Sequence, residues 1–129
     1  MAQFKVYGRE HVLHPLRTRL SDTVHAAAVD VLGLPAAKRL HRFSPVTAEG
    51  FPTPQGRSEE YTILEVLMFT GRSVATKEAF HQRLYRDFEA HLGIEAIDLE
   101  ISIVEAPRHD WGIRGRAGDE LTLSYRVEQ

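Results

Sequence analysis

Residues 61–69 read YTILEVLMF, an almost continuous apolar run that only Glu65 interrupts. A strand with one face in water would carry a polar residue at every second position. A run that is apolar at both odd and even positions is typical of a central strand covered on both faces. It therefore predicts a sheet with this strand near its middle.

After this run the spacing of apolar residues changes from that of a strand to that of a helix. Gly71 turns the chain, and Ser73 is a residue type that caps helix N-termini. Gly93 is positioned to end the helix. A further strand is expected where apolar residues alternate between positions 99 and 103. The apolar stripe of the helix consists of Phe80, Leu84, Phe88 and Leu92.

The first part of the chain has the same plan. Phe4 and Val6 alternate with polar residues, which predicts a strand that starts at Ala2. We expect a loop over residues 8–14, with Pro15 in the first turn of a helix. Gly33 ends that helix, and a short strand is expected around residues 40–46. The helix stripe consists of Leu16, Leu20, Val24, Ala27 or Ala28, and Val31.

The two halves align at a constant offset of sixty residues, and the helix ends match best, as LGL at 32–34 and LGI at 92–94. This indicates a duplicated β-α-β unit. The predicted fold class is α+β (α/β), with tandem β-α-β units forming a four-stranded mixed sheet and two helices on one face. The chain is predicted to be a single domain, 1–129, with repeats at about 2–46 and 60–104 and an extension at 105–129.

One face of such a sheet is left uncovered, so we expect a homo-oligomer in which another copy covers it. A ferredoxin-like fold has the same order of elements and is the alternative. The turn-rich connection at 47–60 favours side-by-side units over the hairpin usual in that fold. The extension is expected to end in a strand at 121–127 and to reach a neighbouring subunit.

Composition excludes several classes of function. The net charge of −2 argues against a nucleic-acid binder, and the lack of cysteine rules out disulfides and thiolate chemistry. No apolar run is long enough to span a membrane, and early charges argue against a signal peptide, so a cytoplasmic location is the default expectation. The seven histidines form no convincing metal-ligand set, and no phosphate-binding glycine loop follows a strand.

Four local motifs resemble the tautomerase superfamily, and most closely its malonate semialdehyde decarboxylase-like branch. They are LGLP at 32–35, RSEEYTILEV at 57–66, GRSVATKEAF at 71–80 and EAPRHDWG at 105–112. The resemblance implies the tautomerase (MIF-like) fold, a homotrimer, no cofactor and a pocket at the start of the first strand. It also implies an isomerase-type reaction in which an N-terminal proline transfers protons on small carbonyl acids.

This chain lacks the catalytic N-terminal proline, because Ala2 occupies its place. If Met1 is removed, the Ala2 amine becomes the candidate base, since an α-amino group titrates at about 7.7–8.0. Lys38 replaces the acidic residue of the branch. Of its two arginines after the third strand, Thr70 replaces the first and Arg72 matches the second.

The predicted substrate-binding residues are Arg72, Arg42, Trp111, Arg114 and Lys38. Arg72 precedes a helix N-terminus, where an anion is favoured, although an ion pair with a nearby acid is the alternative. Trp111 is either a pocket wall or a packing anchor at an interface. Lys38 and Arg42 either make the pocket cationic or are simply solvated. Arg114, together with Arg116, is a candidate to substitute for the arginine lost at position 70.

These residues support a tautomerase-superfamily protein that transfers a proton on a small keto acid. The first alternative is a non-catalytic, small-carboxylate-binding or structural trimer that has lost activity. The second is a ferredoxin-like dimer that binds a small molecule. Neither nucleic acid nor membrane is expected as a partner.

Overall fold

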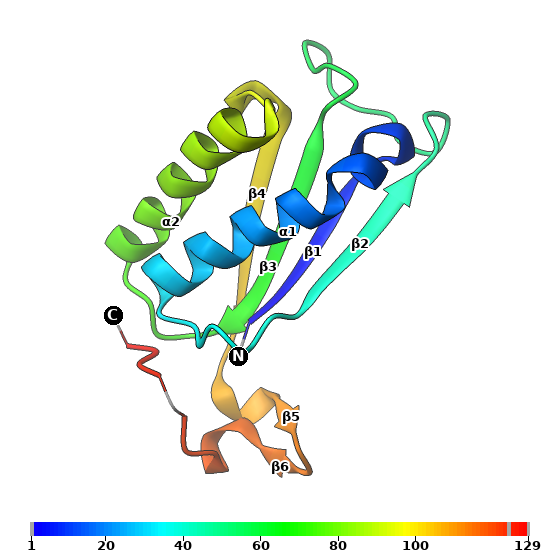
Figure 1. The fold of residues 1–129 in the computed structure, drawn as a ribbon. Helices are drawn as coiled ribbons and strands as arrows, with labels where there is room; N and C mark the ends of the chain where they lie inside the picture. Colours follow the sequence, from blue (N-terminus) through cyan, green and yellow to red (C-terminus); the bar gives the residue numbers. More distant parts are fainter. Residues whose placement is uncertain (1, 124, 129) are drawn as a thin grey trace.

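The computed structural model describes residues 2–123 and 125–128. Within them, a four-stranded sheet is followed along the chain by a small C-terminal hairpin (Figure 1). The main elements are β1 (Ala2–Arg9), α1 (Glu10–Leu32), β2 (His41–Val46), β3 (Thr62–Phe69), α2 (Val74–Asp87) with a π-helical turn at Phe88–Leu92, and β4 (Leu99–Ala106). The hairpin consists of β5 (Gly112–Ile113) and β6 (Arg116–Ala117), and short 3-10 turns lie at Ala96–Asp98, Arg108–Asp110 and Gly118–Glu120.

The strand order β2-β1-β3-β4 confirms the mixed sheet and the two side-by-side units. β1 pairs with β2, and β3 with β4, in parallel. The units are joined by antiparallel pairing of β1 with β3, in which Phe4 lies opposite Val66. Because each unit keeps its two strands adjacent, the split β-α-β arrangement of a ferredoxin-like fold is excluded.

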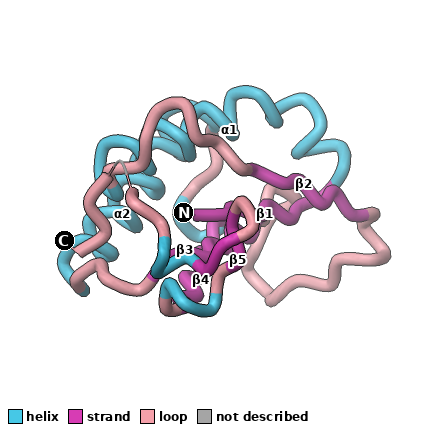
Figure 2. Tube along the Cα trace, turned by 90° about the horizontal axis from the view of Figure 1, so that it is seen from below, coloured by secondary structure: helices cyan, strands magenta, loops and turns pink. Residues whose placement is uncertain are grey.

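Both helices cover the same face of the sheet, as expected (Figures 1 and 2). In β1, alternate residues are buried beneath them, including Phe4 and Val6. Phe80, Leu84 and Phe88 of the second helical segment are completely buried. Full burial of a side chain of this size contributes about 1.5–3 kcal/mol, so each of these residues is a substantial part of the core.

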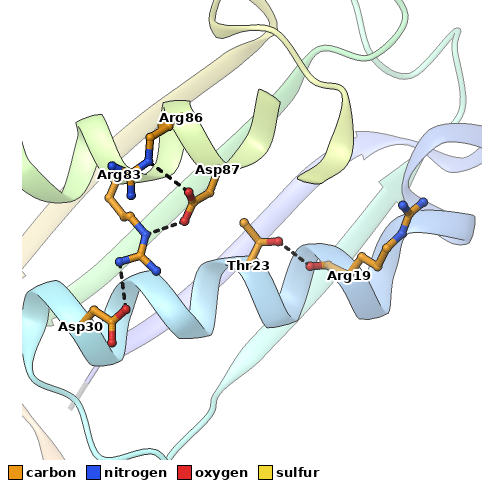
Figure 3. Close-up of polar contacts among 6 residues, drawn as sticks. All are labelled: Arg19, Thr23, Asp30, Arg83, Arg86 and Asp87. Atoms are coloured by element: carbon orange, nitrogen blue, oxygen red, sulfur yellow. Dashed lines mark hydrogen bonds and ion pairs between the residues drawn. The ribbon is translucent and has the colours of Figure 1, made fainter. Parts of the chain in front are cut away.

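An ion-pair network holds the two helices together (Figure 3). Arg83 of α2 donates to Asp87 at 2.5 Å and to Asp30 of α1 at 2.9 Å. Burial alone would raise the pKa of Asp87, but its bonds to Arg83 and Arg86 outweigh that effect and hold the pKa below its usual value. Asp87 is therefore an ionised structural carboxylate at neutral pH.

The first helix begins at Glu10, so the prediction of a loop over residues 8–14 with Pro15 in the first helical turn is wrong. Gly8 allows the early start, because a Cβ there would lie 2.9 Å from the Cγ of Leu13. The absence of a side chain at Gly8 lets Leu13 pack against the end of β1. Pro15 is accommodated inside the helix, at the cost of one backbone bond.

The predicted strand at 121–127 is also wrong, since the described residues of that stretch form none. The extension instead makes the β5–β6 hairpin, whose two central residues, Arg114 (φ 50) and Gly115 (φ 80), are left-handed. Left-handed backbone at both positions is the type I′ geometry that suits two-residue hairpins, and sequence propensity would not favour arginine there. No helix among the described residues combines the length and apolarity needed to cross a membrane.

His41 of β2 lies against α1 and is held neutral. Its Nδ1 is 2.7 Å from Ser21 Oγ, and its ring stands edge-on to Phe4 at 5.1 Å between centroids. Burial, together with the positive charge of Arg39 and the neighbouring His25, lowers the pKa of His41 to about 4, although Asp22 opposes this.

We therefore expect stability to fall as the pH drops below about 6.5, the ordinary histidine pKa. In the unfolded chain His41 takes up a proton near pH 6.5, whereas in the folded protein it stays neutral down to about pH 4. The stabilisation is complete above 6.5 and lost toward pH 4, by roughly 1–3 kcal/mol given partial exposure. In urea unfolding, the free energy of unfolding of His41→Gln should fall less between pH 6.5 and pH 4 than that of the wild type. The control His91→Gln, at an exposed histidine, should show the same pH dependence as the wild type. The same pH dependence in all three proteins would contradict the role of His41.

Candidate functional site

A cavity of about 260 Å³ opens at the start of β1. Its wall combines the first residue of the strand, the connection between α1 and β2, and one residue of the C-terminal segment. The lining residues are Ala2, Leu34, Pro35, Ala37, Lys38, Arg39, Leu40 and Tyr125. The cavity is thus mostly apolar, with cationic side chains at one side.

The connection after α1 is folded around the beginning of the sheet by backbone bonds. Gly33 takes a left-handed conformation (φ 71) that ends the helix, as the sequence predicts. Lys38 N donates to the Pro35 carbonyl at 3.0 Å, which closes a turn. Phe4 N donates to the Leu40 carbonyl at 3.0 Å, which ties that turn to β1. Together these bonds bring Lys38 and Ala2 to the same cavity.

The two cations at the cavity differ in their partners. Arg39 donates to Asp22 at 2.6 Å, so its charge is already compensated. Lys38 is half-buried, and no ion-pair partner for it occurs in residues 2–123 and 125–128. Ala2 is 5% exposed. A small anion in the cavity would therefore meet the uncompensated charge of Lys38 beside Ala2.

Arg72 is buried next to the cavity, with 5% of its surface exposed. Its Nη2 donates to the Leu32 carbonyl at 2.9 Å and so provides a cation at the C-terminus of α1, whose last turn has no basic residue. Its Nε and Nη1 are buried and have no hydrogen-bond partner among the described residues. Burial lowers the pKa of Arg72, while Glu105 and Glu128 oppose this.

Tyr125 forms the wall between Arg72 and the cavity. Its side chain lines the cavity, and its ring centroid is 5.9 Å from the guanidinium carbon of Arg72. Val127 fixes the same segment, because it packs so closely on Gly71 that a Cβ there would lie 2.9 Å from Val127 Cγ1. The sequence-predicted residues Ala2, Lys38 and Arg72 are thus gathered at one end of the sheet.

The other predicted residues lie elsewhere in the chain. Arg42 is on the sheet face opposite the helices, where it donates to Gln3 Oε1 at 3.1 Å. Trp111 packs edge-on against Phe69, with 5.0 Å between ring centroids, and donates to the Ala106 carbonyl at 3.3 Å. Arg114 is exposed at the hairpin turn. Within one chain, Trp111 is therefore a packing anchor for the extension.

Sequence reasoning missed much of the cavity wall. The helix stop at Gly33 indicated a turn, but nothing in it showed that the following residues would wrap around Ala2. Tyr125 carried no signal, since it was expected in a strand. In the part of the chain that the structure describes, no group of three histidine or acidic side chains could hold a metal ion. The missed lining residues are Leu34, Pro35, Ala37, Arg39, Leu40 and Tyr125.

Comparison with known proteins identifies relatives of this fold. A family model described as "Tautomerase enzyme" matches residues 38–114. The chain is similar to a malonate semialdehyde decarboxylase, with 27% identity, a TM-score of 0.82, and coverage of 93% of this chain and 99% of the other. A second, FG41 malonate semialdehyde decarboxylase, was solved after inhibition by 3-bromopropiolate (24% identity, TM-score 0.81, coverage 94% and 98%).

A third similar structure is an asymmetric trimer of a wild-type fused 4-OT, designated R7. It shares 19% identity and a TM-score of 0.80, with coverage of 92% of this chain and 97% of the other. At that identity the likeness establishes the fold alone.

The unpartnered donors of Arg72 predict an unusual response to substitution. Arg72→Met removes a buried charge whose Nε and Nη1 are unsatisfied, which offsets the loss of its bond to Leu32. We expect an unfolding free energy, measured in urea, that is unchanged or about 1 kcal/mol higher. The matched control is Arg83→Met, which breaks the ion pairs of this guanidinium with Asp30 and Asp87 and should cost roughly 2–3 kcal/mol. If Arg72→Met and Arg83→Met lose the same unfolding free energy, Arg72 stabilises the fold and the prediction is wrong.

Proposed function

The chain belongs to the tautomerase enzyme family, and we propose that it binds a small carboxylate or keto acid at the Ala2 cavity and transfers a proton next to the carbonyl. The observation that carries this proposal is the meeting of Ala2 with the uncompensated charge of Lys38 in one cavity of about 260 Å³. The ligand carboxylate is held by Lys38, and by Arg72 behind Tyr125.

The base in this proposal is the amine of Ala2, in a chain from which Met1 has been removed. An unperturbed α-amino group titrates at about 7.7–8.0, and a nearby ammonium such as Lys38 favours its neutral form. The neutral amine takes a proton from the carbon next to the carbonyl, which leaves an enolate. The resulting ammonium then returns the proton to the enolate, at its oxygen to give the enol or at its carbon to give the keto form.

The similar malonate semialdehyde decarboxylase was also solved as a variant with alanine in place of proline at its first position. In the present chain Ala2 would take that position once Met1 is removed. A primary amine lacks the rigid ring and secondary-amine basicity of proline, so slow proton transfer is expected. The second candidate function is therefore a small-carboxylate-binding protein without turnover, which the replacement of an acidic residue by Lys38 favours.

We further propose a homotrimer, since the R7 fused 4-OT that resembles this chain is a trimer. On the uncovered sheet face, Val104 is 55% exposed beside half-buried Leu67. Covering this face with another copy would remove apolar surface from water. In such an assembly Arg42, Trp111 and Arg114 would lie at or near subunit boundaries and could complete a neighbour's cavity.

Two matched chains, one starting at Met1 and one at Ala2, test the base. We expect phenylpyruvate enol–keto conversion to be faster in the chain that starts at Ala2. In that chain the Ala2 nitrogen is a free amine, whereas in the chain that starts at Met1 it is part of a peptide bond. Native mass spectrometry confirms the first residue of each sample. Equal and negligible rates in both chains would eliminate the Ala2 amine as a base and leave the binding function.

Binding is tested separately by thermal shift with pyruvate. At a pyruvate concentration that saturates the wild type, Lys38→Met should show a smaller rise in melting temperature than the wild type. The variant lacks the uncompensated charge at the cavity and should bind pyruvate more weakly. The control is Arg19→Met, which removes an exposed charge on α1. If Lys38→Met and Arg19→Met both keep the full shift, the cavity is not the carboxylate site.

A further inference from the structure

Glu105, like Arg72, is a charged residue with a buried side-chain atom that makes no hydrogen bond to any described residue. It lies near the end of β4, opposite Met68 of β3. Its Oε1 accepts a bond from Lys77 of α2, and its side chain is 22% exposed. Its Oε2 is buried and has no hydrogen-bond partner among residues 2–123 and 125–128. A buried carboxylate oxygen without a donor is destabilising, so its retention needs a reason.

The topology brings Glu105 and Arg72 to the same end of the sheet. β3 and β4 are parallel, and Thr70 N donates to the Ala106 carbonyl at 3.1 Å, so the pairing continues just beyond β3. Arg72 follows two residues later with unpartnered Nε and Nη1. The carboxylate is near enough to the guanidinium to oppose the effect of burial on the pKa of Arg72. Free donors and a free acceptor thus belong to neighbouring side chains.

A ligand that satisfies both residues must accept hydrogen bonds from Arg72 and donate one to Glu105. A plain carboxylate offers acceptors only, and it would be repelled by the Glu105 oxygen that it left unpaired. A carboxylate that also carries a hydroxyl or enol O–H meets both requirements. A keto form lacks this donor.

We propose that Glu105 is a specificity-determining residue that accepts the O–H of a hydroxy or enol acid whose carboxylate is held by Arg72. This inference rests on the proposed function, because it concerns the same ligand class. It extends that function by assigning the enol tautomer, rather than the keto tautomer, as the better-bound form. Because Tyr125 lines the cavity and packs on the Arg72 guanidinium, the proposal requires its ring to be displaced when the ligand binds.

Calorimetric titration with lactate and propionate tests the proposal, since these acids have the same carbon chain and differ by one hydroxyl. We expect the wild type to bind lactate about tenfold more tightly, a difference typical of one buried hydrogen bond to a charged group. Glu105→Gln should lose most of this preference. It should also bind propionate as tightly as the wild type or more tightly, because it removes a negative charge beside the anion. A purely structural role would weaken both ligands together.

The control is Glu100→Gln, which removes the same charge at the other end of β4, where Glu100 accepts a bond from Tyr61. It should leave the lactate preference unchanged. Equal binding of both acids by the wild type would overturn the proposal and would indicate water between Arg72 and Glu105. Parallel weakening of both acids in Glu105→Gln would also overturn it. If the wild type binds neither these acids nor pyruvate, the proposed function fails with it.

Discussion

The antiparallel pairing of β1 with β3 is the constraint on which the rest of the structure depends. It joins the two β-α-β units into one sheet and sets Ala2 opposite Met68. The first residue of β1 therefore lies at the same end of the sheet as the final residues of β3 and β4. Glu105 is the next-to-last residue of β4, and Arg72 lies just beyond the end of β3. The pairing of β1 with β3 brings together residues some seventy positions apart, and the pairing of β3 with β4 adds Glu105, about a hundred positions from Ala2.

The helix ends illustrate what the sequence can predict. The LGL and LGI repeats located both glycine stops, because a left-handed residue after a helix has a strong local preference for glycine. The start of α1 was missed because it depends on Gly8 packing against Leu13, a contact that helix periodicity does not contain. The hairpin turn was missed because Arg114 adopts a conformation that its residue type disfavours.

The residues of the candidate site also differ in how far the sequence predicts their positions. Ala2, Lys38 and Arg72 were predicted as site residues from position and resemblance, and the chain gathers them. Arg42 was assigned to the pocket, yet strand alternation puts it beside Gln3 on the opposite face. Tyr125 was beyond reach, because its place over Arg72 depends on the packing of the extension. Position and resemblance were enough to predict that Ala2, Lys38 and Arg72 lie near one another, whereas residues brought in by distant packing gave no signal in the sequence.

The position of Ala2 has a practical consequence for work with the protein. β1 starts beside the cavity, so any peptide joined ahead of Ala2 leaves the sheet at the cavity mouth. An affinity tag or fluorescent label fused there would stand at the mouth of the cavity, and the proposed Ala2 base requires that no residue precede Ala2. Met1, or any residue that a protease leaves ahead of Ala2, keeps the Ala2 nitrogen in a peptide bond. Handles for purification or immobilisation are better placed in the long connection between β2 and β3, at the far end of the sheet.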